Sequence, residues 1–285
     1  MWQLKFVVIV VSGLLGLLIG CIALYRKSKS FRFRTKYFSF NCLMMFFAMC
    51  CSFVGAFHPF DVGNFHRCSG VVYRSLVRLF RIRSEIQGME IFNTLKGKNF
   101  IIVANHQSSL DMFVILQATP HRTTFLAKKE LLFAPVFGFA AWLFGIVFIN
   151  RGHSKSARNV MDKTAKWICD QKINLWIFPE GTRSQTGTLL PFKRGAFHLA
   201  QQAQLPIVPI VIYDYSSIFN KKNKLFEYGT MKARVLSPIP TEGVTADGVP
   251  ELTETVRQQM IKVFQEGDPS KSLKDTVSTV DKKIK

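Results

Sequence analysis

The chain has 285 residues, enough for one catalytic domain with attached segments. Its 38 Lys and Arg against 18 Asp and Glu give a net charge of +20, which favours an anionic partner such as nucleic acid, an acidic membrane surface or a phosphorylated substrate. A hydrophobic content of 48% with 27 Phe argues against a soluble nucleic-acid binder and favours a protein partly embedded in lipid. The six cysteines have no regular spacing, so they indicate neither a disulfide framework nor a zinc site.

The N-terminal region is predicted to anchor the chain in a membrane. Residues 6–24 carry no charge and are long enough for one transmembrane helix. The run ends in an aromatic residue and two basic residues, which favours an uncleaved anchor over a signal peptide. A second apolar run covers about 37–57. We therefore expect membrane-anchoring helices in residues 1–60, with a basic loop at 26–36 that stays in the cytosol.

The second apolar run bears on the topology. If both runs crossed the membrane, the rest of the chain would lie on the side opposite the basic loop. We therefore expect the second run to dip into the cytosolic leaflet or lie along it, followed by a basic amphipathic interfacial linker at 61–83. The arginines expected to face lipid headgroups are Arg67, Arg74, Arg78, Arg81 and Arg83.

From residue 84 to 265, short apolar strands alternate with helical stretches. The expected strands lie near 100–104, 124–127, 146–149, 175–178 and 207–213. The expected helices lie near 109–117, 135–144, 156–171 and 195–204. This alternation predicts an α/β domain with a largely parallel sheet flanked by helices, whose functional residues gather at strand ends.

Two further segments need an interpretation. The run 131–149 is apolar enough to imitate a transmembrane helix, but Pro135, Gly138 and Gly145 interrupt it, so we expect it to be core or shallowly embedded. The tail at 266–285 is polar and is predicted to be disordered. It ends in three lysines around one isoleucine, similar to a dilysine retrieval signal of endoplasmic reticulum membrane proteins.

His106 and Asp111 form a candidate general base. His106 follows a predicted strand and Asp111 lies in the first turn of the next helix, within reach of the imidazole. A carboxylate on one imidazole nitrogen fixes the tautomer and leaves the other nitrogen free to take a proton from an alcohol. The same spacing from Ser108 to Asp111 also resembles a helix capping box, so local spacing leaves both interpretations open.

Basic residues recur at other strand ends. The segment 178–184 follows a predicted strand, and its Gly181 turn and Arg183 can offer donors to a phosphate. Lys193 and Arg194 precede a helix start, which also favours an anion. Arg151 ends another predicted strand. Three cationic strand ends in one domain indicate a phosphate site.

In this order, the segments resemble the glycerolipid acyltransferase family, specifically its 1-acylglycerol-3-phosphate acyltransferases. The resemblance covers about residues 95–240 and rests on four blocks: His106 to Asp111, Phe148 to Arg151, Phe178 to Phe197, and the apolar 205–210. It implies the family's fold, a catalytic His106–Asp111 pair, and no metal or cofactor. The residues it assigns to the substrate phosphate are Arg151, Glu180, Gly181, Thr182 and Arg183. A further phosphate contact, from Lys128 or Lys129, is a weaker implication. Asn150 departs from the aspartate common at that position.

The resemblance implies that a fatty acyl group passes from acyl-CoA to the sn-2 hydroxyl of lysophosphatidic acid. The expected partners are therefore these two substrates and membrane lipids, with no nucleic acid and no protein partner predicted. The expected location is the endoplasmic reticulum membrane, with the catalytic domain facing the cytosol.

Other functions remain to be weighed. A serine hydrolase could use Ser108 or Ser109, but the sequence has no Gly-x-Ser-x-Gly elbow. A metal enzyme is disfavoured because the histidines show no ligand spacing. A basic membrane-surface scaffold remains possible on charge alone. Within the enzyme class, the acceptor could be glycerol 3-phosphate or another lysophospholipid.

Overall fold

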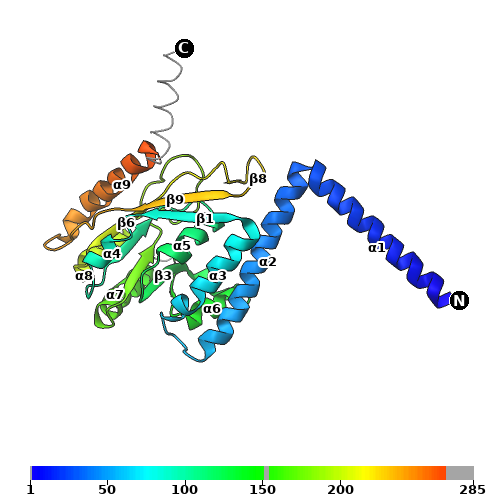
Figure 1. The fold of residues 1–285 in the computed structure, drawn as a ribbon. Helices are drawn as coiled ribbons and strands as arrows, with labels where there is room; N and C mark the ends of the chain where they lie inside the picture. The colour runs from blue at the N-terminus through cyan, green and yellow to red at the C-terminus, as the bar shows by residue number, and fades with distance from the viewer. Residues whose placement is uncertain (1, 151–153, 268–285) are drawn as a thin grey trace, which may run out of the picture.

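The computed structural model describes residues 2–150 and 154–267, and a seven-stranded sheet lies at its centre (Figure 1). The sheet runs in the order β1-β9-β6-β2-β5-β3-β4. Its strands are β1 Ile82–Gln87, β2 Ile101–Ala104, β3 Thr123–Lys128, β4 Val147–Ile149, β5 Asn174–Ile177, β6 Ile207–Ile212 and β9 Gly229–Val235. A separate hairpin pairs β7 Phe219–Asn220 with β8 Leu225–Phe226.

Helices make up most of the rest of the described chain. They are α1 Trp2–Lys27, α2 Lys29–Ala56, α3 Asn64–Phe80, α4 Ile91–Thr94, α5 Met112–Ala118, α6 Phe137–Leu143, α7 Ser154–Asp170, α8 Gly195–Ala203 and α9 Val249–Glu266. Short 3-10 turns are η1 Ser109–Asp111, η2 Lys129–Phe133 and η3 Ala246–Gly248.

The predicted α/β fold with a largely parallel sheet is confirmed. The five expected strands, β2 to β6, all run parallel to one another. The other two strands of this sheet, β1 and β9, were not expected and run the other way, because β9 pairs antiparallel with β6 and β1 pairs parallel with β9. The ends of β2 and β5 therefore meet at one edge of the sheet, where functional residues of α/β proteins gather.

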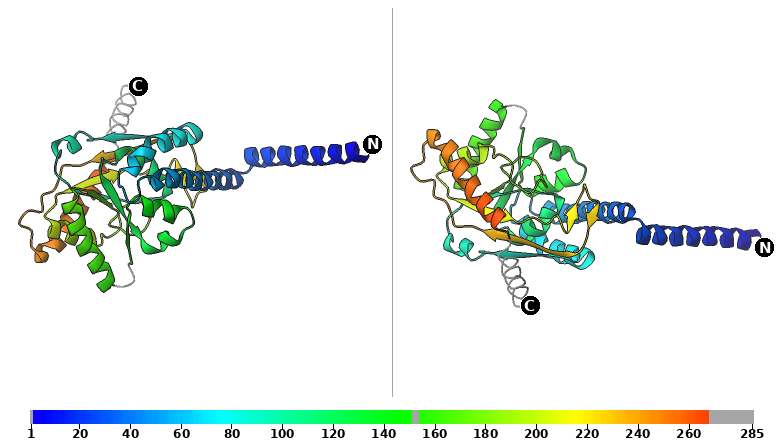
Figure 2. Two further views of the ribbon diagram at one scale, coloured as in Figure 1. Left: turned by 90° about the horizontal axis from the view of Figure 1, so that it is seen from below. Right: turned by 90° about the horizontal axis from the view of Figure 1, so that it is seen from above.

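Two hydrophobic layers hold the sheet. Alternate residues of β2 point to opposite faces, so Ile101 and Val103 join one cluster while Ile102 and Ala104 join the other. The first cluster also contains residues of α7, α8 and α9, and the second contains residues of α2, α3 and α5. The views along the sheet in Figure 2 show these helices on its two sides. Both faces of the central strands β2, β5 and β6 are thus buried, as their mostly apolar sequence requires.

The basic segment 26–36 is helical, which corrects the expectation of a loop. Only Ser28 separates α1 from α2. The Ser28 hydroxyl accepts a hydrogen bond from the backbone N–H of Phe31, at 3.2 Å, and so caps the N-terminus of α2. Because a side chain satisfies a free helix donor at this point, the chain starts a second helix immediately after the first.

The helix α2 belongs to the folded body, so residue 60 is not a structural boundary. Phe40 of α2 is 1% exposed, and its ring lies 5.5 to 6.3 Å from the rings of Phe80, Phe113 and Phe226. The predicted linker 61–83 contains α3, whose Leu76 is fully buried. The α/β body thus begins before residue 84.

The opposite side of α2 is apolar and exposed. Within the described residues, α2 is the one helix long and apolar enough to cross a membrane by length and composition. Its exposed large side chains include Phe38, Phe46, Phe53 and Phe57. Side chains near the end of α1 are also apolar and about half exposed or more, among them Leu18 and Ile19. One side of this helical pair is therefore suited to lipid, and the other side of α2 to the protein core.

The run 131–149 folds back on itself as η2, α6 and β4 and does not form one long helix. Gly138 is required at the turn, because a Cβ atom there would lie 2.0 Å from the carbonyl oxygen of Leu132. α6 packs against α2 and leaves Phe139 and Trp142 exposed, beside Phe133 of η2. This run extends the apolar surface of α2, and its shallow embedding in a membrane stays a prediction.

The two sides of α2 can be separated by a matched pair of substitutions. We expect Phe40→Ala to lower the free energy of unfolding by about 3–5 kcal/mol, because it opens a cavity among three aromatic rings. Phe38→Ala, at a side chain that is 71% exposed, should leave it nearly unchanged. Thermal unfolding of the full chain in neutral detergent measures both, and equal effects would contradict the docking of α2 on the domain.

Candidate functional site

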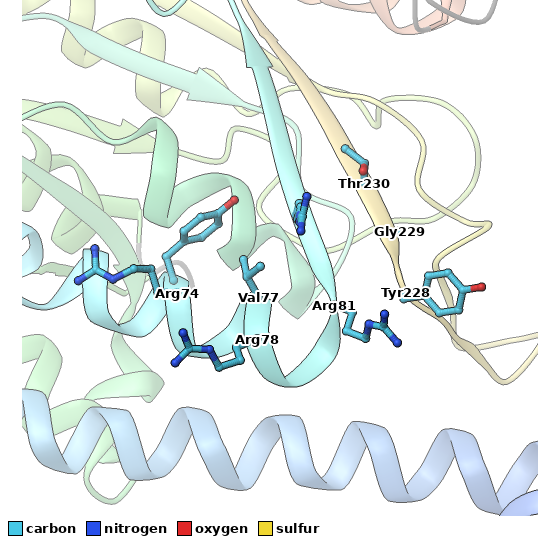
Figure 3. A pocket seen from close by; sticks show the side chains of 9 residues that line it. Arg74, Val77, Arg78, Arg81, Tyr228, Gly229 and Thr230 are labelled. Atoms are coloured by element: carbon cyan, nitrogen blue, oxygen red, sulfur yellow. The ribbon is translucent and has the colours of Figure 1, made fainter.

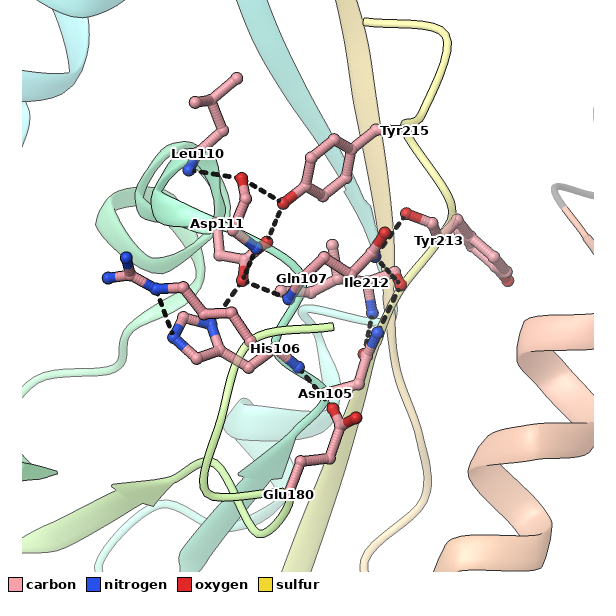
Figure 4. Close-up of polar contacts among 11 residues, drawn as sticks. Asn105, His106, Gln107, Leu110, Asp111, Glu180, Ile212, Tyr213 and Tyr215 are labelled. Atoms are coloured by element: carbon pink, nitrogen blue, oxygen red, sulfur yellow. Dashed lines mark hydrogen bonds and ion pairs between the residues drawn. The ribbon is translucent and has the colours of Figure 1, made fainter. Parts of the chain in front are cut away.

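The His106 turn and the 178–184 segment come together at the carboxyl edge of the sheet (Figure 4). His106 follows β2, and Phe178 directly follows the neighbouring strand β5. The two rings stack, with 4.1 Å between their centroids. The backbone N–H of Ser184 donates to the carbonyl of His106 at 2.9 Å. Two segments about 70 residues apart in the chain thus form one site.

Asp111 holds the imidazole of His106. Its Oδ2 atom lies 2.5 Å from Nδ1 of His106 and also accepts from the backbone N–H groups of Gln107 and Ser108, at 2.8 and 3.1 Å. The side chain of Asp111 is fully buried, and that of His106 is 18% exposed. Because an ionised carboxylate only accepts hydrogen bonds, Nδ1 carries the proton and Nε2 keeps its lone pair.

The capping box that the sequence allowed is also present. Ser108 is the N-cap of η1, and its hydroxyl accepts from the backbone N–H of Leu110 at 3.0 Å. The Asp111 carboxylate accepts from the backbone of Ser108 in return. The capping interpretation and the catalytic interpretation are therefore compatible, since one carboxylate satisfies the helix start and the imidazole together.

Tyr215, which no sequence motif indicates, completes the contacts of Asp111. Its hydroxyl lies 2.5 Å from Oδ1 of Asp111 and 2.8 Å from the hydroxyl of Ser108. Burial and the neighbouring Asp111 charge raise the pKa of Tyr215 well above its usual value, so it stays a neutral donor. The only sequence signal was its position just after β6, and that is shared by many core tyrosines.

Two amides fasten the turn to the end of β6. The side chain of Asn105 donates to the carbonyl of Ile212 and accepts from its N–H, at 2.9 and 2.8 Å. The side-chain amide of Gln107 donates to the carbonyls of Ile212 and Tyr213, at 2.9 and 3.0 Å. The residues on both sides of His106 are therefore bound to β6, and this fixes the direction in which the imidazole projects.

The free nitrogen of His106 faces Arg183. The Nε–H of Arg183 donates to Nε2 of His106 at 3.2 Å. Arg183 is exposed, so this contact lies at the open side of the site. A hydroxyl that approached Nε2 would take the position of this donor and lie beside the guanidinium.

Glu180 connects the His106 turn to the loop that follows β5. It is 5% exposed, and its two oxygens accept from the backbone N–H groups of His106 and Leu190, at 2.7 and 2.9 Å. Burial raises the pKa of this carboxyl, while the two N–H groups favour its ionised form. A carboxylate engaged in this way offers no donor to a phosphate. The geometry supports a structural role for Glu180 and gives no support to the predicted phosphate contact.

The remaining predicted residues lie around this centre. Gly181 has φ +71°, and a Cβ atom there would lie 2.9 Å from Nζ of Lys193. The Lys193 side chain therefore packs over the Gly181 turn, next to the exposed Thr182. Lys128 ends β3 and pairs with Glu130 at 3.2 Å.

Two of the predicted cations remain to be located. Lys129 is exposed at the start of η2. Arg151 lies outside the described residues.

A small apolar cavity of about 190 Å³ lies next to Phe178. Phe178, which stacks on His106, forms part of its wall, with Leu126, Met161 and Ile177. Gly181 and Lys193 line its polar side. The site thus combines an imidazole held by a carboxylate, nearby cations and an apolar recess.

The sequence of the chain is similar to those of known proteins. A family model described as Acyltransferase matches residues 83–213. The human 1-acyl-sn-glycerol-3-phosphate acyltransferase alpha is 46% identical over 188 residues, which cover 66% of this chain and 66% of that protein. The human beta enzyme is 42% identical over 195 residues, covering 68% and 69%.

A solved structure also resembles the fold. The crystal structure of the 1-acyl-sn-glycerophosphate acyltransferase PlsC from Thermotoga maritima has a TM-score of 0.63 at 22% identity, covering 84% of this chain and 97% of that one. At this identity the likeness concerns the fold alone. The sequence matches and the fold together show that the chain belongs to the 1-acyl-sn-glycerol-3-phosphate acyltransferase family.

Proposed function

We propose that this chain transfers a fatty acyl group from acyl-CoA to the sn-2 hydroxyl of 1-acyl-sn-glycerol 3-phosphate, releasing phosphatidic acid and CoA. The observation that carries the proposal is the geometry around His106, whose Nδ1 is held by a buried carboxylate while Nε2 faces an exposed arginine. The names of the relatives support lysophosphatidic acid as the acceptor.

The chemistry is general-base catalysis without an acyl-enzyme. The substrate hydroxyl approaches Nε2 of His106 and gives up its proton while its oxygen bonds to the thioester carbonyl carbon. The tetrahedral intermediate then collapses, the carbon–sulfur bond breaks, and the CoA thiolate leaves and takes the proton from the imidazolium. Asp111 stabilises that imidazolium through Nδ1–H without itself accepting the proton.

The acceptor phosphate is assigned to the cations on the open side of His106. Arg183 is exposed beside Nε2 of His106, so its guanidinium can bind the phosphate oxygens of the acceptor. The sn-2 hydroxyl of the same acceptor would then replace Arg183 as the hydrogen-bond partner of Nε2. Lys193 lies over the Gly181 turn and adds a second positive charge. Arg151 follows the end of β4, and Lys128 ends the adjacent strand β3, so both are further candidates. Thr182 can add a hydroxyl.

A membrane location suits an acceptor with one acyl chain. The apolar surface of α2 and α6 supports membrane association of the chain, and its site needs access to lipid. We propose the endoplasmic reticulum membrane, with His106 and the phosphate-binding cations on the cytosolic side. Acyl-CoA, the co-substrate, would then reach the site from water.

The central test is an acyl-transfer assay with radiolabelled oleoyl-CoA and purified full chain. We expect wild type to acylate lysophosphatidic acid in preference to glycerol 3-phosphate and to lysophospholipids with larger headgroups. His106→Ala should lower kcat by a factor of about 10² to 10⁴, the usual contribution of a general base. His58→Ala, at an exposed histidine, is the matched control and should retain full activity. Equal activity of His106→Ala and wild type would rule out the mechanism.

Arg183 should act on the acceptor more than on the donor. We expect Arg183→Ala to raise the KM for lysophosphatidic acid about tenfold or more, because one charge-assisted phosphate contact is lost. The KM for acyl-CoA should change little. Arg234→Ala, at an exposed arginine of β9, is the control. A rise confined to the KM for acyl-CoA would instead assign Arg183 to the donor.

Glu180 should act through structure. In Glu180→Gln, an amide NH₂ group replaces one of the two carboxylate oxygens. Either the backbone N–H of His106 or that of Leu190 then loses its acceptor while remaining buried. We expect a loss of about 1–3 kcal/mol in the free energy of unfolding, together with reduced kcat. Glu242→Gln, at an exposed carboxylate, should change neither. Unchanged stability with a raised KM for the acceptor would show that Glu180 serves the phosphate after all.

A further inference from the structure

An arginine-lined depression of about 660 Å³ lies away from His106, between the end of α3 and the paired starts of β1 and β9 (Figure 3). We name it the arginine depression and define it by Arg74, Arg78, Arg81, Arg83 and Tyr228. None of these residues contacts the His106 site in the described chain. The function proposed above therefore leaves the depression without a role.

The positive charge of the arginine depression is not neutralised by the protein. Within the described residues, none of its four guanidinium groups forms an ion pair, and all four arginines are exposed. The guanidinium of Arg81 lies 5.9 Å from the centre of the Tyr228 ring, a cation–π contact that holds it at the rim. Arg67, the fifth arginine of the predicted linker, differs because it pairs with Asp61 at 2.7 Å.

Like charges gathered in one depression repel one another and favour an anion that they can share. Guanidinium groups match phosphate oxygens as planar, often bidentate donors. Glu85, two residues beyond Arg83 on β1, is exposed and forms no ion pair with these arginines in the described chain. A phosphate group therefore complements the arginine depression in both charge and hydrogen-bonding geometry.

The position of the depression favours a lipid as the source of that phosphate. Glu227, next to Tyr228, is engaged by α2, since Lys36 approaches it at 3.4 Å and Arg32 at 3.9 Å. Lys36 also donates to the carbonyl of Phe226 at 2.7 Å. The rim of the depression is thus bound to the first turns of α2, beside the junction with α1 (Figure 1).

The junction of α1 and α2 is where the apolar surface changes to a basic one. Described side chains of α1 such as Leu18 and Ile22 are apolar and exposed, whereas the next turns carry Arg26, Lys27 and Lys29. Basic residues that follow an apolar helix lie at the level of lipid headgroups. The depression, fastened to this junction, lies at the same level.

We propose that the arginine depression binds the headgroup phosphate of an anionic phospholipid, at a site separate from the acyl-transfer centre. The occupied site would fix the height and tilt of the domain against the membrane. This sharpens the expectation of diffuse headgroup contacts at 61–83, because it selects four of the five arginines and adds Tyr228, which lies just before β9 and about 150 residues away in the chain.

The test measures lipid binding without acyl transfer, so its result is independent of the proposed reaction. Full chain in neutral detergent micelles is titrated with dioctanoyl phosphatidylglycerol, a diester that is neither substrate nor product of that reaction. A ligand that binds the folded state raises Tm. We expect a saturable rise in Tm for wild type, and a rise at least halved in Arg74→Gln/Arg78→Gln. Dioctanoyl phosphatidylcholine, which has no net charge, should give no such rise.

Controls separate the site from overall charge and from folding. Lys96→Gln/Lys98→Gln removes two exposed charges near the opposite edge of the sheet and should keep the full rise. Glutamine is chosen because it keeps a helix propensity close to that of arginine on α3. If the Arg74→Gln/Arg78→Gln variant is unstable without lipid, Arg83→Gln on β1 tests the same site. An equal rise in wild type and both depression variants would overturn the proposal. The proposal would also be overturned if inorganic phosphate raised the Tm of wild type as much as the lipid does and the depression variants lost that rise. The site would then bind a soluble phosphate and not a lipid.

Discussion

The rest of the site depends on the hydrogen bonds that the buried carboxylate of Asp111 accepts. Transferring an ionised carboxylate out of water is costly unless hydrogen bonds replace its hydration. Here the donors are the imidazole Nδ1–H, the N–H groups of Gln107 and Ser108, and the hydroxyl of Tyr215. They come from the β2 turn and from the segment after β6. The orientation of the His106 imidazole therefore depends on the packing of two strand ends.

Glu180 repeats this arrangement on the other side of the same residue. Asp111 holds the side chain of His106, and Glu180 holds its backbone N–H. Glu180 also accepts from Leu190, so it fastens the loop that carries Arg183 to the turn that carries the base. Two buried carboxylates thus fix the distance between the proposed base and the proposed phosphate-binding loop. The cations themselves remain exposed and available to a substrate.

Much of this fold could be predicted from local patterns, and the exceptions have physical causes. The central strands β2, β5 and β6 are short, mostly apolar runs that are buried along their whole length, so local composition indicates them. β1 and β9 alternate buried and charged positions, and their pairing depends on partners about 150 residues apart. The 26–36 segment looked like a loop because it is basic, but charge does not oppose a helix when Ser28 caps it.

The site divides in the same way. His106 and Asp111 are five residues apart, so their spacing predicts that they can meet, although the same spacing also suits a capping box. Tyr215 lies 104 residues from the carboxylate it contacts. The resemblance assigns Glu180 to the phosphate, and nothing in the sequence of this cationic loop indicates which donors its carboxylate accepts from. Its actual partners are backbone N–H groups, which are the same at every position in a sequence except proline. Side chains that act on the backbone are therefore the part of a site that only a folded structure can identify.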